Sequence, residues 1–341
     1  MPVPEQPVLR DGDLVLRPWT DTQHDLDTRL LHDEVIAEWV GTERAVPSEE
    51  EHRAAIARWH AGWADDRRTV SFLCEWRGSP AGSVELRRKD AGVGELSWIT
   101  YAALRGQGIA PRAVRLLAAY AFDEMGLERV EAHVDARNRA SLRTALKAGL
   151  RREGLLRGNA CLGGQRRDTV VLGRRRGDPE PDTREGFIGI LNSTLPTKRA
   201  IAQGVLRRAS GEVLLCELTY KAEWDLPGGV VDPSESPADC VVREVREELG
   251  LEVSPQRLLA VNWLPPWRGW TDATVFVFDL GTVSEEQLDR AALQPREIRA
   301  LHWCGEEELE ARVAPYNQRL LAFLSAHSGP TAYLEDGLPA L

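Results

Sequence analysis

Carboxylates recur at close spacing in the segment GVVDPSESPADCVVREVREELGL, residues 229–251. Glu244, Glu247 and Glu248 stand at i, i+3 and i+4, so a helix would place all three side chains on one face. Like charges stacked in this way repel one another and destabilise an isolated helix. A bound divalent cation would offset the repulsion, and Mg²⁺ prefers carboxylate oxygens. The spacing therefore indicates a helix that could hold a divalent cation, with a solvated, charged surface helix as the alternative.

Residues at both ends of this segment define the expected helix. Ser236 can cap its N-terminus, Pro237 suits its first position, and Gly250 can end it. Arg243 can reach back to Glu235 and tie the helix to the loop before it.

A second chemical pattern is a glycine-rich turn between an expected strand and an expected helix. The turn reads Arg105-Gly106-Gln107-Gly108-Ile109-Ala110, and Pro111 follows at a position where its missing N–H is no loss. Successive backbone N–H groups, with the positive end of a helix behind them, can bind a pyrophosphate. Gly108 would let the phosphate approach the backbone closely. The alternative is a plain connection whose helix packs through its apolar face.

Charge is distributed unevenly along the 341 residues. The formal net charge is −10. Residues 1–178 hold 28 Lys+Arg against 27 Asp+Glu, whereas residues 179–341 hold 15 against 26. An acidic half does not attract a nucleic-acid backbone, so we expect no nucleic-acid partner. Clustered carboxylates could instead bind divalent cations.

Nothing in the sequence predicts membrane insertion or disulfides. No apolar run approaches the roughly 20 residues that span a bilayer, and the N-terminus lacks the layout of a signal peptide. The cysteines lie far apart with no CxxC pair, so neither a zinc site nor a disulfide framework is indicated. We therefore expect a cytoplasmic protein with no membrane partner.

The chain divides at a segment rich in charge, proline and glycine. Residues 174–186, RRRGDPEPDTREG, lack apolar periodicity, which is typical of a linker. Both halves mix expected strands and helices, which indicates a two-domain α/β (α+β) protein. We expect domains at 1–178 and 188–325, a linker at 179–187 and a separate tail at 326–341.

Apolar periodicity predicts the elements that position both patterns. The expected strands are 14–16, 70–75, 82–86, 94–99, 129–134, 200–207, 213–218 and 273–279. The expected helices are one around Trp39 and those at 56–63, 111–124, 139–148, 237–249 and 315–326.

The glycine-rich turn resembles the acetyl-CoA signature of the GNAT acetyltransferase superfamily, Arg/Gln-x-x-Gly-x-Gly/Ala. Arg105, Gly108 and Ala110 match it. Asn138-x-x-Ser141, together with the segments LVLRPW and EGLLR, resembles the branch that acetylates ribosomal proteins and small amines. The resemblance implies a GNAT fold with a mixed sheet in the N-terminal half.

This resemblance implies roles for individual residues. The amides of Arg105–Ala110 would bind the pyrophosphate of acetyl-CoA, and Asn138 would contact the cofactor or simply cap a helix. Ser141 could protonate the departing CoA thiolate, or face solvent without a role. Glu95 could take a proton from the attacking amine, directly or through water, or be an ordinary surface carboxylate. The acceptor would be an amine of a small molecule or a protein N-terminus.

The carboxylate segment matches the Nudix signature G-x5-E-x7-R-E-U-x-E-E-x-G-U, in which U is a bulky apolar residue, at every specified position. WDLPGG leads into it, as in that family. The resemblance covers about residues 188–325 and implies an α/β/α sandwich. The nine matching residues are Gly229, Glu235, Arg243, Glu244, Val245, Glu247, Glu248, Gly250 and Leu251.

The Nudix resemblance implies metal-assisted cleavage of a diphosphate. Mg²⁺ (or Mn²⁺) would neutralise the diphosphate and activate water for attack on phosphorus. Glu235 and Arg243 would support the ligands, and Glu297 is a candidate base, with an exposed loop residue as the alternative. The implied metal ligands are the Gly229 carbonyl, Glu244, Glu247 and Glu248.

Aromatic residues after this segment bear on the substrate. Pro266 lies fifteen residues after Leu251, a spacing that resembles relatives that cleave ADP-ribose. Trp267 or Trp270 could stack on a nucleotide base, although packing on the core is an equal alternative.

We therefore expect a bifunctional enzyme. One half would transfer acetyl from acetyl-CoA to an amine, and the other would hydrolyse a nucleoside diphosphate linked to a further group, X. Two alternatives stay open: a Nudix half that only senses a nucleotide and regulates the acetyltransferase, and an acetyltransferase half that only binds CoA and mediates dimerisation. A homodimer is compatible with either.

Overall fold

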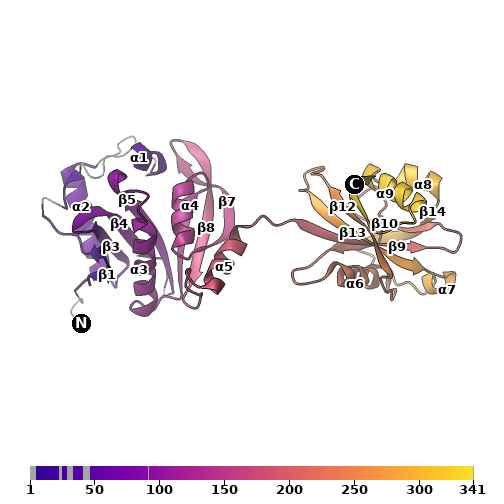
Figure 1. Ribbon diagram of the computed structural model, residues 1–341, viewed down its shortest axis with the longest axis horizontal. Helices are drawn as coiled ribbons and strands as arrows, with labels where there is room; N and C mark the ends of the chain where they lie inside the picture. The colour runs from indigo at the N-terminus through magenta and orange to yellow at the C-terminus, as the bar shows by residue number, and fades with distance from the viewer. Residues whose placement is uncertain (1–4, 23–24, 29–33, 41–46, 91, 341) are drawn as a thin grey trace. The chain divides into compact units, whose positions relative to one another are not determined.

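The computed structural model describes residues 5–22, 25–28, 34–40, 47–90 and 92–340. The chain forms two compact units, Met1–Leu195 and Pro196–Leu341, and each contains a mixed β-sheet with helices packed on it (Figure 1). Within the described ranges, no helix is long and apolar enough to cross a membrane. The expected two-domain α/β architecture is confirmed.

The described N-terminal sheet has eight strands in the order β1-β2-β3-β4-β5-β6-β8-β7. All neighbours are antiparallel except β5 and β6, which are parallel. The strands are β1 (Leu9–Asp11), β2 (Leu14–Arg17), β3 (Thr69–Trp76), β4 (Ser79–Arg88), β5 (Val93–Thr100), β6 (Arg129–Asp135), β7 (Arg151–Leu162) and β8 (Gln165–Arg175).

Helices cover both faces of this sheet. Side chains alternate along β3, so Phe72 packs with Leu117 of α3 while Leu73 packs with Ile56 of α2 on the opposite face. The sheet face that α3 covers also receives Ala145 of α4. The helices are α1 (Glu34–Val40), α2 (Glu49–Ala64), the 3₁₀ turn η2 (Ala102–Leu104), α3 (Ile109–Asp123), α4 (Arg139–Lys147) and α5 (Arg184–Thr194).

The described C-terminal sheet follows the order β14-β10-β9-β13-β12-β15-β16, and β11 pairs with β9 beside this path. β9 runs parallel to β13, and β12 runs parallel to β15. The strands are β9 (Arg199–Arg207), β10 (Val213–Leu218), β11 (Gly228–Val230), β12 (Arg257–Leu264), β13 (Ala273–Thr282), β14 (Ile298–Cys304), β15 (Ala332–Glu335) and β16 (Leu338–Pro339).

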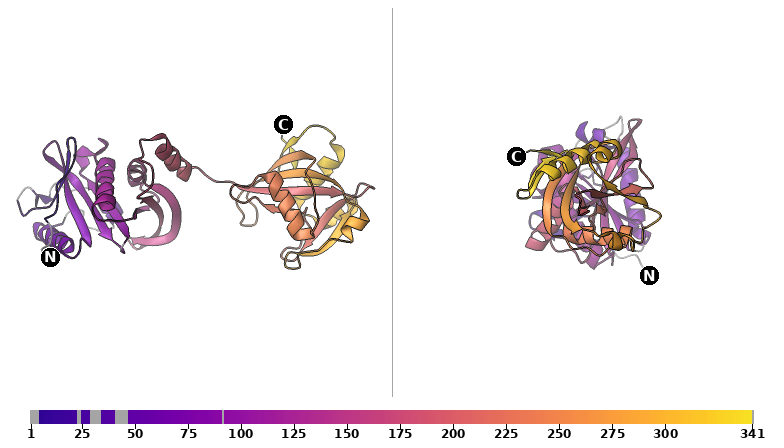
Figure 2. Two further views of the ribbon diagram at one scale, coloured as in Figure 1. Left: turned by 90° about the horizontal axis from the view of Figure 1, so that it is seen from below. Right: turned by 90° about the vertical axis from the view of Figure 1, so that its right-hand side faces the viewer.

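Alternation along β9 separates two cores. Ala202 and Leu206 pack toward Val245 of α6, whereas Val205 packs toward Leu320 of α9. Figures 1 and 2 show α6 on one side of this sheet and α9 on the other, which is the expected α/β/α arrangement. The helices are α6 (Pro237–Leu249), α7 (Glu285–Leu288), α8 (Glu306–Arg312) and α9 (Pro315–Ala326).

Helix α6 has the predicted bounds because its end signals are local. Ser236 Oγ accepts a hydrogen bond from the Asp239 N–H at 3.1 Å, and Pro237 occupies the first turn. Gly250 ends the helix in the left-handed region, with φ +67°.

The segment expected to be a linker is folded onto the N-terminal unit instead. Thr183 caps α5 by accepting from the Gly186 N–H at 3.1 Å, and Glu180 pairs with Arg174 at 2.5 Å. The Arg152 N–H donates to Ser193 Oγ at 3.0 Å, which fixes α5 beside β7. The unit boundary therefore falls at 195/196, not at 179–187, because charged residues that suggested an extended linker are paired within the fold.

The expected separate tail also belongs to a sheet. β15 extends the C-terminal sheet by pairing with β12, and the Asp336 N–H donates to the Trp263 carbonyl at 2.8 Å. Asn262, which is fully buried, accepts from the Gly337 N–H at 3.0 Å. Residues 326–340 therefore complete the C-terminal unit.

These contacts predict how truncation affects the N-terminal unit. A fragment ending at Leu195 should unfold at a higher temperature than one ending at Pro181, because the shorter fragment leaves the α5 side of β7 uncovered. A loss of at least about 1 kcal/mol corresponds to ~2–4 °C for a domain of this size. Circular dichroism of both fragments measures the difference, with residues 196–341 as the complementary fragment. Equal midpoints would show that α5 does not stabilise this unit.

Candidate active sites

Helix α6 lies very close to β11 at two glycines. A Cβ at Gly229 would collide with the carboxylate of Glu244, and a Cβ at Gly228 would collide with the Ala202 carbonyl on β9. The Gly228 N–H donates to Glu248 Oε2 at 3.1 Å. Gly229 therefore lets the Glu244 carboxylate approach the backbone of β11, and Gly228 lets β11 lie close to β9.

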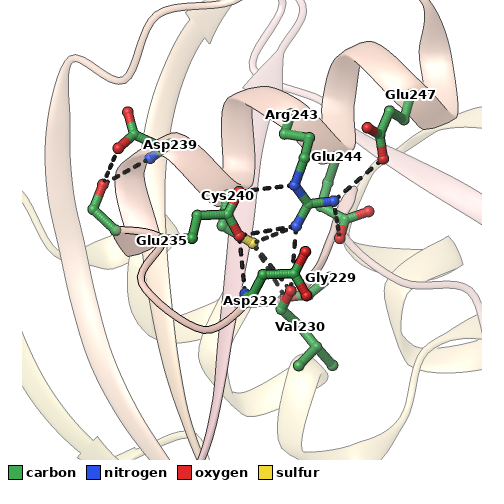
Figure 3. Close-up of polar contacts among 10 residues, drawn as sticks. Gly229, Val230, Asp232, Glu235, Asp239, Cys240, Arg243, Glu244 and Glu247 are labelled. Carbon is green, nitrogen blue, oxygen red and sulfur yellow. Dashed lines mark hydrogen bonds and ion pairs between the residues drawn. The ribbon is translucent and has the colours of Figure 1, made fainter.

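Arg243 is the centre of a polar cluster that joins α6 to the preceding loop (Figure 3). Its guanidinium donates to both oxygens of Glu235, at 2.8 and 3.0 Å, which lowers the pKa of that carboxyl to about 2. The same group donates to Glu244 at 2.9 Å and to Glu247 at 3.2 Å. Arg243 therefore ties α6 to the preceding loop through Glu235.

Glu248 is the most confined carboxylate of the site. It is only 5% exposed, and no cation pairs with it among the described residues. Burial is the main cause that raises its pKa to about 8; the nearby charges of Glu244, Glu297 and Asp225 contribute to this rise, and the hydrogen bond from Gly228 opposes it. Burial also raises the pKa of Glu244, although Arg243 opposes that rise. Glu248 is therefore largely protonated at neutral pH when no cation is bound.

The later loop brings Glu297 into the field of these carboxylates. Glu297 raises the pKa values of both Glu244 and Glu248, and the Gln294 N–H donates to the Glu248 carbonyl at 2.9 Å. The predicted residues Glu244, Glu248 and Glu297 are thus close enough to interact.

The residues fit a divalent cation by their chemistry, although their side chains are not gathered as ligands. Within the described ranges, no three Asp, Glu, His or Cys side chains are grouped closely enough to hold a metal ion. Arg243 holds Glu244 and Glu247, and the side chain of Glu247 is 55% exposed. The buried, cation-free carboxyl of Glu248 beside Glu244 nevertheless supplies the hard oxygen donors that Mg²⁺ prefers.

A buried polar network, which sequence reasoning did not identify, adjoins this cluster. Asp225 of the WDLPGG segment accepts from Gln203 Nε2 at 2.8 Å and from Asn317 Nδ2 at 2.6 Å, and it also pairs with Lys221. The amide oxygens of Gln203 and Asn317 are buried without a hydrogen-bond partner. In the sequence, only Asp225 stood out, because it belongs to the WDLPGG segment. Its partners Gln203 and Asn317 lie far away in sequence, on β9 and α9.

The N-terminal site is built around two strands that diverge. β5 and β6 pair only through residues 93–95 and 129–131, although β5 continues to Thr100 and β6 to Asp135. Trp98, Ile99 and Thr100 line the cavity that opens beyond the paired part. The N–H and C=O groups of β5 beyond Glu95 are therefore not used in pairing with β6, and they remain accessible from the cavity.

This cavity has a volume of about 490 Å³ and contains most of the predicted cofactor-binding residues. Gly106 and Gly108 adopt left-handed φ values of +79° and +78°, and a Cβ at either would meet no atom within 4 Å. The glycines therefore present an open backbone surface to the cavity. The predicted residues that line it are Arg105, Gly106, Gly108, Ile109, Ala110, Asn138 and Ser141.

The remaining predicted residues of this half are placed differently. Asn138 Oδ1 accepts from the Ser141 N–H at 3.0 Å, so it caps α4 and also lines the cavity. Gln107 does not line it. Glu95 lies in the paired part of β5, opposite Arg87 and Glu131, and outside the cavity lining, so the structure does not bring it together with Ser141.

The tryptophans expected to contact a base lie on one exposed loop. Trp267 and Trp270 are 43% and 64% exposed, and their loop lines a shallow, open hollow of about 330 Å³. Trp267 meets Tyr316 edge-on, and the guanidinium of Arg199 lies over Trp270 at 4.8 Å. The loop therefore holds both rings outside the core, with a guanidinium over one face of each: Arg199 over Trp270 and Arg268 over Trp267.

The raised pKa of Glu248 predicts a pH-dependent stability without metal. Its carboxyl ionises near pH 4.5 when unfolded but near pH 8 when folded, so its contribution to stability falls as pH rises from about 4.5 to 8. Calorimetry of metal-free Glu248→Gln should therefore show little change in Tm at pH 5 and an increase of a few degrees at pH 8. Exposed Glu252→Gln is the matched control. An increase that is equal at both pH values would contradict the assigned pKa.

Comparison with known proteins finds a matching family model for each of the two units. A family model for the acetyltransferase (GNAT) domain matches residues 13–151, and one for the NUDIX domain matches residues 197–324. Probable N-acetyltransferase YjcK of Bacillus subtilis (strain 168) is 39% identical over 102 residues, which cover 29% of this chain and 56% of that protein. The chain thus spans about half the length of this acetyltransferase relative.

The C-terminal unit matches longer parts of its relatives. The MutT-like protein of Streptomyces ambofaciens is 30% identical over 143 residues, which cover 42% of this chain and 86% of that protein. CTP pyrophosphohydrolase of Escherichia coli (strain K12) is 30% identical over 128 residues, covering 36% and 89% respectively. The chain belongs to the Nudix family through its C-terminal domain, and its residues 13–151 are similar to the acetyltransferase (GNAT) domain.

Proposed function

We propose that this chain is a bifunctional enzyme. Its N-terminal domain transfers acetyl from acetyl-CoA to an amine, and its C-terminal domain hydrolyses a nucleoside diphosphate linked to X with Mg²⁺ or Mn²⁺. The observation that carries the second activity is the carboxylate cluster around Glu248, which has too few cations to balance it unless one binds.

The N-terminal cavity supports the acetyl-transfer proposal. Gly106, Gly108 and Ile109 line it at the start of α3, where a pyrophosphate would interact with the positive end of the helix. Pantetheine would enter the opening between β5 and β6 and lead the thioester toward Ser141. Ser141 would donate its hydroxyl proton to the leaving thiolate.

The C-terminal cluster supports hydrolysis. The Gly229 carbonyl and the carboxylates of α6 would hold the cation, which when bound neutralises diphosphate oxygens and makes water a better nucleophile. Glu248 must lose its proton for this, so cation binding should release a proton near neutral pH. Arg243 keeps α6 against the loop through Glu235, and we propose Glu297 as the base that accepts the proton of the attacking water.

The substrate proposal rests on the exposed aromatic loop. Trp267 or Trp270 would stack on the nucleobase, since stacking contributes about 1–3 kcal/mol. One relative is named a CTP pyrophosphohydrolase, which places CTP in the panel of nucleotides to be assayed. The second candidate function, a nucleotide sensor, is disfavoured because sensing alone does not require Glu244, Glu247 and Glu248 together.

Acetyl-CoA binding is tested by filling the open space at Gly108. Gly108→Trp should weaken CoA binding by at least about 100-fold, ~2.7 kcal/mol, because the indole would occupy the phosphate position. Isothermal calorimetry measures this. Gly126→Trp is the control, since Gly126 has a similar φ of +69° and an open Cβ position but lies beyond the other end of α3. Unchanged affinity in Gly108→Trp would remove the turn from the binding site.

Hydrolysis is tested with the intact protein, Mg²⁺ and a panel that includes ADP-ribose and CTP. Glu247→Gln and Glu248→Gln should each lower kcat by at least about 100-fold, ~2.7 kcal/mol, because too little charge remains to hold the cation. EDTA should abolish turnover, and Glu252→Gln should leave it unchanged. Turnover that survives EDTA and both substitutions would exclude the metal mechanism. Nucleotide binding without turnover would favour the sensor.

A further inference from the structure

The cavity of the N-terminal domain is lined by cations on two sides. Arg105 stands beside the glycine-rich turn, and Arg143 and Lys147 stand on α4. None of the described residues that line this cavity is an aspartate or a glutamate. The lining therefore favours a ligand with several negative charges.

Arg143 and Lys147 have no acidic partner within 4 Å among the residues that the structure describes, although most arginines of this chain are ion-paired. They stand at i and i+4 on α4, so both heads lie on the same face, where like charges repel. A multiply charged anion between them would remove this repulsion. Their neighbour Arg139 is also exposed and unpaired in the described structure, but it does not line the cavity.

Arg143 and Lys147 lie farther along α4 than the residues that would face the pyrophosphate at the glycine-rich turn. Ser141 lies in the first turn of α4, near the opening of the strands, and Lys147 is its last residue, about 9 Å farther along the axis at 1.5 Å per residue. The amides of the turn and the N-terminus of α3 already account for a pyrophosphate. The cations on α4 are therefore available to a second phosphate.

We propose that Arg143 and Lys147 bind the 3′-phosphate of the CoA nucleotide and so make this domain select CoA over its dephosphorylated form. This rests on the proposed binding of acetyl-CoA in the cavity. A phosphate monoester carries close to two negative charges at neutral pH and offers three acceptor oxygens, which matches two adjacent cationic donors. The selection is a property of the side chains of α4, whereas pyrophosphate binding depends on the backbone of the turn.

The experiment compares CoA with 3′-dephospho-CoA by isothermal calorimetry on the intact protein. Wild type should bind CoA at least about tenfold more tightly, as expected for charge-assisted hydrogen bonds to an added phosphate. The Arg143→Gln/Lys147→Gln double variant should lose this preference to within about threefold, while its affinity for dephospho-CoA stays that of wild type. That unchanged affinity also shows that the variant is folded. Arg139→Gln, on the same helix, should keep the full preference.

Three results would overturn the assignment. Equal affinities of wild type for the two ligands would show that the 3′-phosphate is not recognised. A double variant that weakens both ligands by the same factor would place the cations at the pyrophosphate instead. Failure of wild type to bind either ligand would overturn the proposed acetyltransferase function together with this inference. This result differs from equal binding of the two ligands, which would overturn only the inference. Rising salt should reduce the preference of wild type, since exposed charges are screened.

Discussion

The interaction that organises the C-terminal domain is the repulsion among carboxylates held where α6 meets β11. Glu248, Glu244, Glu297 and Asp225 interact electrostatically, and Arg243 offsets only part of their charge. Apolar packing of α6 on β9 keeps the helix in place despite this repulsion. The repulsion decreases if Glu248 takes up a proton or if a cation binds. The same packing that stabilises the domain thus keeps it ready for a cation.

The N-terminal domain depends on the opposite electrostatic arrangement. Its cavity lies at the beginnings of both α3 and α4, where unpaired backbone N–H groups and the helix dipoles create positive potential. β4 supports the free part of β5 from its other side, so the divergence from β6 does not unravel the sheet. An anionic cofactor can therefore be held by backbone and cationic side chains without a metal.

Local signals in the sequence predicted the best-defined elements. Helices α6 and α9 begin at prolines and were predicted with their observed bounds, since these prolines, the Ser236 cap of α6 and the apolar spacing lie within a few residues. The hairpin of β7 and β8 and the placement of residues 179–195 were not predicted. Their stabilising partners, such as Arg174 for Glu180 and Arg152 for Ser193, became visible only in three dimensions.

The site residues follow the same rule. Gly108 and Glu248 could be proposed as site residues from the sequence, because the spacing within one turn and within one helix marks them. Glu95 was predicted to accept a proton because it lies near the start of a strand. The pairing of β5 with β6 shows that Glu95 lies before the point where the two strands diverge, and only the structure reveals this.

The uneven charge of the two halves agrees with the phosphate chemistry that we propose for each domain. The N-terminal domain presents cations and amides directly to an anion, so it has no need of excess acidity. The C-terminal domain presents carboxylates, which repel phosphate, so it can approach a diphosphate only through a counter-ion. Each arrangement excludes the other within a single pocket, because carboxylates placed beside the amides of the turn would neutralise them. Two separate folded units are therefore the natural solution for a chain that carries both.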